Sequence, residues 1–449
     1  MAKSVNMGIG RKVDTWLGPL ICALLYFVSR VRGLLGGPPQ PAMHATTPPL
    51  PGGPPLRPRR VLAIKTYGLG NIAMILSVIS ALRREIPEVE VDFLTLPENR
   101  SLLELSGLVR RVLAVDTTSY GSLAGSLLKN LRDIITRRYD VVIDFEQFVK
   151  LSAIIAFLSG APHRFGFNTD GQRRGWLYTT RIVYTDSEHM SQTFMRLLRP
   201  LQIDTSPGEV TFATGPESET AVQALLDEHG IAHAAGPLIV VHVGSGPNFY
   251  DVPLKRWPIQ YFAELADALV ERYGAAVLFT GKGEEEHALV HEAMRLMRRP
   301  AVDACDRLDI AGLLALLRRA DLTVCNDTSV VHLAVALRSR VAVVFGPTDP
   351  LQYGPPQPED LILYQDLYCS PCLTNYNLKV SYCANPVCIR SIPAERALSA
   401  IEKKYFGENA STPLTRPGEG AATGLTEPDA ASPARPSRPR LTLAKDPGS

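Results

Sequence analysis

Residues Asp321–Leu337, DLTVCNDTSVVHLAVAL, contain the strand-to-helix pattern that recurs through most of this chain. The apolar run DLTVC predicts a buried strand, and the apolar residues that end at Leu337 predict a helix soon after it. Between the two, Asp327, Thr328 and Ser329 all suit the N-terminal cap of that helix. Strands that alternate with helices in this way are typical of parallel α/β sheets.

The same alternation extends from this segment over two halves of the chain. The expected strands are 61–65, 89–95, 111–115 and 140–144 in the first half, and 237–243, 275–280, 321–325 and 340–345 in the second. Turn residues around 204–217 separate the halves. Two doubly wound halves predict an α/β fold with a ligand cleft at the carboxyl ends of the strands. This pattern alone suits a dehydrogenase, an epimerase or a binding protein equally well.

The composition narrows the class of protein. The chain has 449 residues, of which 45% are apolar and 20% are charged, and this fits a globular protein with two cores. Its formal net charge is only +2, whereas a nucleic-acid-binding protein would be expected to carry a basic domain or stripe. No nucleic-acid partner is therefore expected.

Three segments fall outside the two halves. The apolar run 16–29, WLGPLICALLYFVS, is too short to span a bilayer, and its basic flanks favour a segment that lies in the membrane interface. The alternative is a helix packed on the protein itself. The expected divisions of the chain are a membrane-interface segment (1–35), a proline-rich linker (36–58), two Rossmann-like domains (59–206 and 207–368), a cysteine cluster with a C-terminal helix (369–406) and a disordered tail (407–449).

A glycine loop, Lys65-Thr-Tyr-Gly68-Leu-Gly70-Asn71, follows the first expected strand. Glycines at such a place allow a tight turn and a close approach of the backbone to a ligand. The dinucleotide-binding fingerprint needs a third glycine, and position 73 is alanine. The loop therefore counts against an NAD-dependent enzyme.

A second glycine loop, HVGSG (242–246), follows the first strand of the second half, and KRWP (255–258) opens a helix after it. Lys255 or Arg256 can face an anion beside the start of this helix. The alternative is that Trp257 belongs to the core and both cations are solvated.

The segment that follows strand 321–325 has two interpretations. One is a well-capped helix with a structural His332. The other is a diphosphate bound at the helix N-terminus, where free N–H groups and the helix dipole favour negative charge.

Four cysteines form the pattern C-x2-C-x10-C-x4-C, at positions Cys369, Cys372, Cys383 and Cys388. Four thiolates in a short segment suit a tetrahedral zinc or iron site, and four protein ligands would make that site structural. Reduced thiols that merely pack together are the alternative.

Several motifs occur in an order that resembles glycosyltransferase family 9, the lipopolysaccharide heptosyltransferases. In the second half they are KRWP, GKGEE (281–285), NDTSVVHLAVAL and FGPTDP (345–350); in the first half, the GLGN loop, DVVIDFEQF and APHRFGF are similar as well. The resemblance covers about Val61 to Phe406. It implies the GT-B fold, in which two Rossmann-like domains have parallel sheets that face an interdomain cleft.

The resemblance also implies an activity. Members of the family are inverting enzymes that transfer a sugar such as heptose from an ADP-sugar to a cell-envelope glycan such as the lipopolysaccharide core, without a metal for the transfer. The implied partners are the ADP-sugar donor, a glycan or lipid-linked acceptor and the surface of the inner membrane, at its cytoplasmic face. One branch of the family resembles this chain in having a four-cysteine iron site.

Donor-side roles carry over to positions of this sequence that match the family's motifs. Lys255 is expected to bind the departing diphosphate, and Asp327 to support transfer more than nucleotide affinity. The remaining donor-side residues are Thr328, Ser329 and His332 at the phosphates and sugar, Glu285 or its neighbour Glu284 at the ribose, and Ser245 and Gly246 at the phosphates.

The acceptor-side loop, with Gly68, Gly70 and Asn71, departs from the family's pattern. Many members have Asp as the general base where this chain has Asn71, and an amide cannot take up a proton near neutral pH. Either Asp144 or Glu146 replaces it, or transfer depends mainly on stabilisation of the leaving group. A third reading is a catalytically degenerate scaffold that binds nucleotide-sugars at the membrane.

Overall fold

The computed structural model describes residues 14–34, 55–231, 236–245, 253–377 and 379–407. All of them lie in one compact unit of the chain, which ends at Leu414. Most of the expected linker, nearly all of the expected tail and Gly246 lie outside the described residues.

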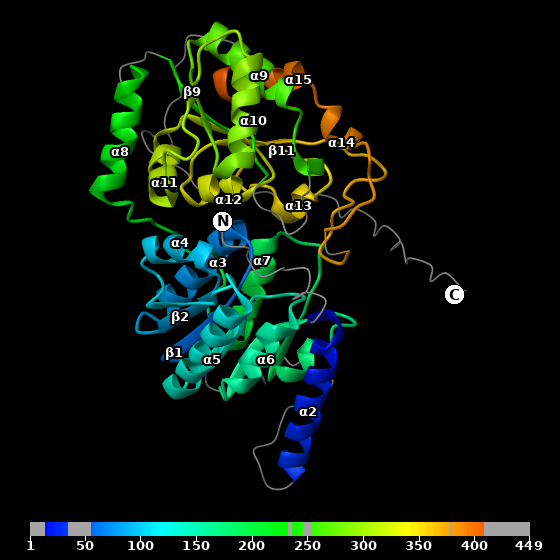
Figure 1. Cartoon of the computed structure of the whole chain (residues 1–449). Coiled ribbons are helices and arrows are strands. Elements are labelled where there is room, and N and C mark those ends of the chain that lie inside the picture. The colour runs from blue at the N-terminus through cyan, green and yellow to red at the C-terminus, as the bar shows by residue number, and fades with distance from the viewer. Residues whose placement is uncertain (1–13, 35–54, 232–235, 246–252, 378, 408–449) are drawn as a thin grey trace. The chain divides into compact units, whose positions relative to one another are not determined.

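The first half, coloured from blue to green in Figure 1, contains one β-sheet. The sheet has six parallel strands in the order β3-β2-β1-β4-β5-β6. The strands are β1 (Arg60–Ile64), β2 (Glu90–Thr95), β3 (Arg111–Ala114), β4 (Val141–Asp144), β5 (His163–Asn168) and β6 (Thr180–Val183). The helices are α2 (Gly18–Leu34), α3 (Leu69–Glu85), α4 (Arg100–Leu105), α5 (Tyr120–Arg137), α6 (Lys150–Leu158) and α7 (Met190–Met195), with 3-10 turns η1 (Pro97–Asn99), η2 (Arg174–Leu177) and η3 (Arg196–Leu201).

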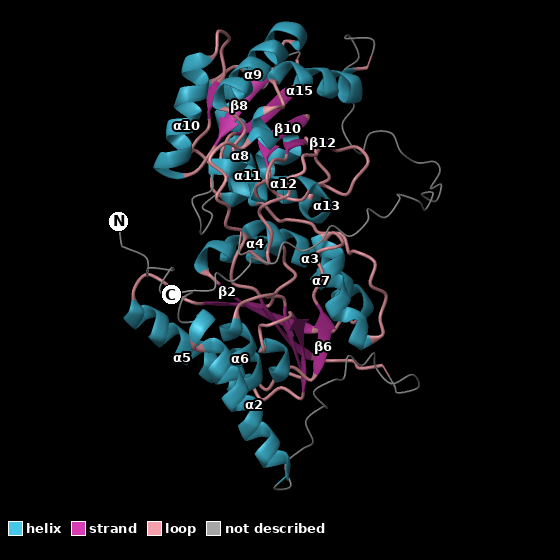
Figure 2. Ribbon diagram, turned by 90° about the vertical axis from the view of Figure 1, so that its right-hand side faces the viewer, coloured by secondary structure: helices cyan, strands magenta, loops and turns pink. Residues whose placement is uncertain are grey.

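The second half repeats this topology, with the parallel order β12-β11-β10-β7-β8-β9. Its strands are β7 (Leu238–His242), β8 (Ala276–Thr280), β9 (Val302–Asp303), β10 (Leu322–Asn326), β11 (Val341–Val344) and β12 (Leu361–Leu363). Its helices are α8 (Gly215–Glu228), α9 (Ile259–Tyr273), α10 (Gly283–Leu296), α11 (Ile310–Arg319), α12 (Ser329–Ala336), α13 (Pro350–Tyr353), α14 (Val387–Arg390) and α15 (Ala394–Ile401), with short turns η5 (Pro253–Lys255) and η6 (Glu402–Phe406). Figure 2 shows the helices packed around the strands of each half.

The central strands are apolar throughout because they supply two cores. In β1, Val61 and Ala63 belong to the core that contains α3, while Leu62 and Ile64 belong to the core under α5 and α6. Helices on both faces of a parallel sheet produce such continuous apolar runs. The prediction of an α/β fold with two Rossmann-like parallel sheets is confirmed.

All eight strands expected from the sequence are present. The four strands that the sequence analysis missed are β5, β6, β9 and β12. Three of these have only two to four residues, and β5 begins with His163 and Arg164 and contains Gly166. Short or polar strands give too few alternating apolar residues to be recognised without the sheet beside them.

Helix α2 packs on the first half through one face. Cys22 is fully buried, and the ring of Tyr26 lies 5.7 Å from that of Trp176. Asp14 accepts hydrogen bonds from the backbone N–H groups of Lys150 at 3.0 Å and Leu151 at 2.9 Å, and so caps the start of α6. On this face, α2 is therefore a helix packed on the protein itself, which was the alternative interpretation of the segment.

The other side of the same segment is apolar and exposed. Between 41% and 77% of the surface of each of seven side chains is accessible, and these are Trp16, Leu17, Leu20, Ile21, Leu24, Phe27 and Val28. No helix among the described residues is both long enough and apolar enough to cross a bilayer.

Candidate functional site

The sequence motifs lie at the centres of the two sheets. They follow β1, β4, β7 and β10, and the strand order reverses between β1 and β4 and between β7 and β10. Ligands of doubly wound proteins bind outside the carboxyl ends of the strands at such reversals. The topology alone thus brings the motifs of each half together.

Lys65 and Glu146 form a buried ion pair across the reversal in the first sheet, with 2.9 Å between Nζ and Oε2. Glu146 Oε1 accepts hydrogen bonds from the backbone N–H of Thr66, at 2.7 Å, and from its hydroxyl. Burial raises the pKa of Glu146, but the charge of Lys65 and these hydrogen bonds outweigh burial, so the pKa is lowered. Glu146 is thus an ionised carboxylate that holds the start of the glycine loop.

The glycine loop lies against the second half of the protein. Gly68 has φ 90°, in the region that favours glycine, and precedes the first residue of α3. A Cβ atom on Gly70 would lie 2.4 Å from Cδ2 of His332, so only glycine allows this approach. Half-buried Asn71 belongs to the same first turn of α3. The structure therefore brings the expected acceptor-side loop beside His332 of the expected donor side.

Asp144 belongs to a separate, fully buried network. Its Oδ2 accepts hydrogen bonds from Arg174 at 2.8 Å and Tyr178 at 2.6 Å, and its Oδ1 accepts one from the backbone N–H of Glu146 at 2.9 Å. Burial raises the pKa of Asp144 more than Arg174 and Tyr178 lower it. From the sequence, Asp144 or Glu146 is the expected substitute for the general base. Because both oxygens of each carboxylate accept hydrogen bonds within the protein, this geometry favours positioning roles.

Asn326, which the sequence analysis did not select, joins the motifs of the second half. Its Nδ2 donates to the carbonyls of Val243 at 2.8 Å and Gly244 at 3.1 Å, and its Oδ1 accepts from the backbone N–H of Trp257 at 2.9 Å. Trp257 is a core residue, as one of the two interpretations held. The sequence feature that could have identified Asn326 is its position as a polar residue at the end of an otherwise apolar strand, directly before Asp327.

Lys255 and Asp327 form a buried ion pair, with 2.7 Å between Nζ and Oδ2. The hydroxyl of Thr348, in FGPTDP, donates to the same Oδ2 at 2.6 Å. Burial raises the pKa of Asp327, but Lys255 and Thr348 outweigh burial and the pKa is lowered. Burial lowers the pKa of Lys255, and the charge of Asp327 opposes that shift. A solvated Lys255, the alternative interpretation, is therefore wrong.

The N-terminus of α12 carries a polar atom that the protein leaves unsatisfied. Thr328 is the N-cap residue, but its side chain makes no capping hydrogen bond. Its Oγ1 is buried and has no hydrogen-bond partner within the described part of the chain. A buried hydroxyl without a partner costs free energy. The orphan hydroxyl beside the free N–H groups of Ser329 and its successors therefore fits an anionic ligand.

His332 lies one turn into α12 and is buried. Burial lowers its pKa to about 4, and the charge of Asp327 opposes the shift. The imidazole is thus neutral near pH 7 and can contribute hydrogen bonding but not charge. A second histidine, His189, is bonded through Nε2 to the carbonyl of Gly354 at 2.9 Å and joins the two halves here.

Lys379, from the cysteine segment, is a second cation near Asp327 that the sequence analysis missed. Its Nζ lies 4.6 Å from the centre of the Tyr353 ring, and the charge of Asp327 opposes the lowering of its pKa by burial. Asn375 holds the same segment in place through hydrogen bonds of 2.7 Å to the hydroxyls of Tyr184 and Tyr353. No sequence pattern connects Lys379 with Asp327, because only folding brings them together.

Ser245 and Glu285 are joined by Arg256 of the KRWP motif. Arg256 Nε donates to Ser245 Oγ at 3.2 Å, and its Nη2 is paired with Glu285. Glu285 and Glu284 are exposed, whereas Glu286 is buried. A Cβ on Gly244 would lie 2.0 Å from Oε1 of Glu286, so this glutamate is packed directly under the second glycine loop.

The four cysteines of the expected metal site are all free thiols; Cys388 is buried, and Cys369 and Cys383 are exposed. Burial, together with the nearby charges of the other three cysteines, raises the pKa of Cys388 to about 11. Ser381 donates a hydrogen bond to the sulfur of Cys372 at 3.4 Å. The thiols are neighbours, but within the described residues they do not form a set whose sulfur atoms lie within 4.8 Å of one another.

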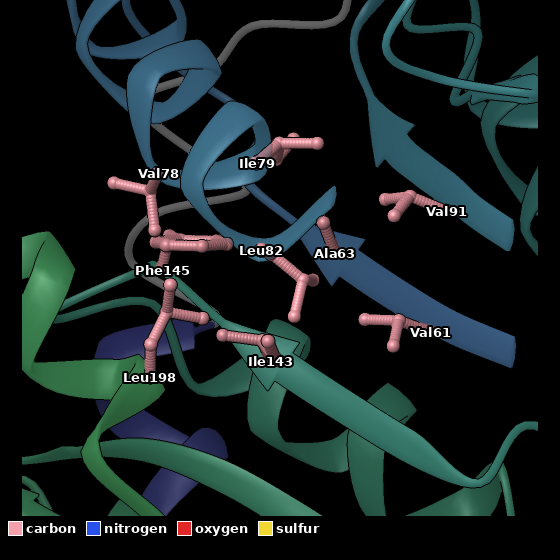
Figure 3. A pocket seen from close by; sticks show the side chains of 9 residues that line it. All are labelled: Val61, Ala63, Val78, Ile79, Leu82, Val91, Ile143, Phe145 and Leu198. Atoms are coloured by element: carbon pink, nitrogen blue, oxygen red, sulfur yellow. The ribbon is translucent and has the colours of Figure 1, made fainter. Parts of the chain in front are cut away.

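Figure 3 shows a small pocket in the first half, and none of these groups lines it. It lies between α3 and the first sheet, and its lining residues are Val61, Ala63, Val78, Ile79, Leu82, Val91, Ile143, Phe145 and Leu198. All nine are apolar, so the pocket offers nothing to a charged donor and is a gap in core packing.

Comparison with known proteins gives a consistent result. The family model described as glycosyltransferase family 9 (heptosyltransferase) matches residues 126–382, more than half of the 449-residue chain. Lipopolysaccharide heptosyltransferase 1 of Pseudomonas aeruginosa is 27% identical over 332 residues, which are 70% of this chain and 86% of that protein. Lipooligosaccharide heptosyltransferase 2 of Haemophilus ducreyi is 25% identical over 318 residues, which are 68% and 88% of the two chains.

Solved structures agree on the fold. A glycosyl transferase family 9 protein from Veillonella parvula has a TM-score of 0.65 and 21% identity, and the match covers 77% of this chain and 96% of that one. The E. coli heptosyltransferase WaaC with ADP has a TM-score of 0.59 and 19% identity, with 77% and 99% covered.

Proposed function

The chain belongs to glycosyltransferase family 9, the heptosyltransferase family, and from this premise we propose that it transfers heptose from ADP-heptose to a lipopolysaccharide core acceptor. The relatives named as lipopolysaccharide heptosyltransferases support this donor and acceptor. The observation that carries the proposal is the buried Lys255–Asp327 pair beside the unsatisfied Thr328 hydroxyl. The alternative of a degenerate scaffold is not favoured, because these relatives are named as transferases.

On the donor side, the diphosphate would lie against the N-terminus of α12. The free N–H groups of Ser329 and its successors, the hydroxyl of Thr328 and the cations Lys255 and Lys379 favour negative charge there. As the acceptor oxygen bonds to C1 of the sugar, the bond from C1 to the diphosphate oxygen breaks and ADP leaves with the bonding electron pair, while the acceptor hydroxyl releases its proton to water. Charge therefore grows on the diphosphate, and these groups stabilise it.

On the acceptor side, Asn71 would orient the acceptor hydroxyl through its carbonyl oxygen. Glu146 would hold the loop that carries Asn71, through Lys65 and Thr66. The rate enhancement then comes mainly from stabilisation of the leaving group. This is the alternative to a substitute base that the sequence left open. The remaining donor contacts proposed are Ser245, Gly246, Glu285 and His332.

A donor screen tests the proposed function. ADP-heptose, ADP-glucose, UDP-glucose and UDP-N-acetylglucosamine would be compared by calorimetric binding and by hydrolysis without acceptor, and then with heptose-deficient lipopolysaccharide as acceptor. Tight binding of ADP-sugars and release of ADP only with acceptor are expected. Tighter binding of UDP-sugars would contradict the proposed donor.

The amino-terminal segment supports a further proposal, that the protein binds the cytoplasmic face of the inner membrane as a peripheral protein. The exposed apolar side of α2, with Leu20, Leu24 and Phe27, suits insertion into the interface together with the exposed Trp16 that precedes the helix. The basic residues at its ends, such as Arg30, suit anionic lipid.

We expect that the triple variant Leu20→Ser, Leu24→Ser, Phe27→Ser no longer floats with phosphatidylglycerol vesicles, because these side chains are 60–65% exposed and do not support the core. The matched control is Leu296→Ser with Leu351→Ser, two exposed leucines of the second half. Flotation of the triple variant as efficient as that of the control would exclude α2 as the anchor. Deletion of residues 1–58 is a poorer test, because it would also remove Asp14 and so leave the N-terminus of α6 without its cap.

The cysteine segment supports the proposal of one structural zinc or iron ion. Four neighbouring cysteine thiols, of which Cys388 is buried, provide the soft donors that these ions prefer. When bound, the ion would fix the segment that carries Asn375 and Lys379.

In elemental analysis of anaerobically purified protein, the cysteine segment is expected to account for about one zinc or iron ion per chain, because four thiolates complete one tetrahedral site. In the Cys372→Ser, Cys388→Ser variant this ion should be absent, while Cys305→Ser, a matched buried cysteine elsewhere, should retain it. Wild-type protein without metal would support packed thiols instead.

A further inference from the structure

Two histidines and an aspartate gather at the edge of the second sheet, and neither the sequence motifs nor the family assigns them a role. His287 and His291 are four residues apart on α10, so they share one face of that helix. Asp303 ends β9, the edge strand next to β8. Among the described residues, this is the set of three such side chains whose ligand atoms all lie within 4.8 Å of one another.

The distances match those around a metal ion. Nε2 of His287 lies 3.4 Å from Oδ2 of Asp303, and Nε2 of His291 lies 3.2 Å from the same oxygen. Donor atoms bound to zinc at about 2.0–2.1 Å in a tetrahedron are about 3.3 Å apart. Both histidine-to-aspartate distances therefore match an edge of a zinc tetrahedron, and the ligand atoms of the two histidines lie within 4.8 Å of each other.

The carboxylate is held in the orientation that binding requires. Asp303 Oδ1 accepts a hydrogen bond from the backbone N–H of Cys305 at 2.8 Å, which directs Oδ2 toward the histidines. The backbone N–H of Ala304 donates to the carbonyl of Phe279 at 2.9 Å and fixes this end of β9. Outer hydrogen bonds of this kind orient the ligands of metal sites.

The site is open to solvent, since 44% of the His287 side chain and 63% of the His291 side chain are accessible. An ion can thus enter, and water can complete its coordination. Two imidazoles and one carboxylate suit zinc and the neighbouring divalent transition metals, whereas magnesium and calcium prefer oxygen ligands. We propose that His287, His291 and Asp303 bind one zinc ion that fastens α10 to the edge strand β9.

The test is a zinc titration of tag-free, metal-stripped full-length protein, followed by calorimetry and by thermal unfolding. Wild type is expected to bind one more zinc ion than His291→Ala or His287→Ala, and the cysteine segment accounts for any other ion. Loss of one ligand should weaken this site by at least about tenfold to a hundredfold, the range produced by loss of an outer partner alone. Asp303→Asn keeps the shape of the side chain and should weaken binding as well.

Glu292→Ala, an exposed residue on the same helix, is the matched control and should keep the wild-type stoichiometry. Zinc should raise the unfolding temperature of the control but raise it less in His291→Ala. Cobalt in this site should give visible absorption without the thiolate charge-transfer band, and His291→Ala should lose that absorption. Equal zinc stoichiometry in wild type and both histidine variants would overturn the proposal.

Discussion

Replacement of Lys255 by alanine is expected to lower transfer by about a hundredfold to a thousandfold, the cost of removing one preorganised charge-stabilising group. Lys255 is buried against Asp327, where the low dielectric strengthens its interaction with a diphosphate. ADP affinity should fall too, because the cation acts on the nucleotide in both the bound and the reacting state. Steady-state kinetics and calorimetry with ADP check both effects.

The variant also leaves Asp327 buried without its main partner, and breaking a buried pair costs about 3–5 kcal/mol of stability. Thermal unfolding must therefore accompany the kinetics. Lys255→Ala with Asp327→Ala removes both charges and serves as a second variant that should fold better and remain slow. Lys282→Ala, an exposed lysine of the same half, is the matched control. Unchanged ADP affinity in the Lys255 variant would remove its diphosphate role.

Replacement of Glu146 by glutamine is expected to lower turnover by about a hundredfold or more, with ADP affinity nearly intact. Glutamine keeps the shape of the side chain but removes the charge that pairs with Lys65, and its amide has only one acceptor oxygen where the carboxylate uses one for Lys65 and one for Thr66. The position of the loop with Asn71 would then be lost. Because Glu146 lies in the first half, the donor contacts should persist.

The pH dependence separates a positioning role from that of a base. If Glu146 positions the loop, the pH profile of kcat keeps its shape in Glu146→Gln and only its height falls. Disappearance of the limb on the acidic side would instead show that Glu146 accepts the proton. Wild-type turnover in this variant would exclude both roles.

Two further substitutions complete the comparison. Asp144→Asn should lower the unfolding temperature sharply, because Asp144 forms a buried pair with Arg174. Asn71→Asp should raise turnover, because it places at the start of α3 a carboxylate that can accept the proton of the acceptor hydroxyl. Activity that appears only in Asn71→Asp, on any acceptor, would favour the scaffold hypothesis over the transferase.

The sequence by itself determined the fold class and the places of the chemistry. Eight of the strands and the main helices follow from apolar periodicity, because central parallel strands and the helices beside them have long apolar faces. Glycine loops and the 326–332 segment could be placed at strand ends for the same reason. The ordered motifs also indicated the family, which the family model confirms.

Only the tertiary structure decided which side chains pair with one another and which remain available to bind a ligand. Glu146 and Lys65 are 81 residues apart, and Asn326 bonds to residues 69 to 83 positions away, so no local pattern contains these pairs. The same holds for the contacts of Lys379 and Glu286 and for the cluster of His287, His291 and Asp303, which form only in the folded chain. The spacing of apolar residues along the sequence shows whether a single segment is a helix or a strand. Burial and charge pairing depend instead on how separate helices and strands pack against one another, and that packing exists only in the folded chain.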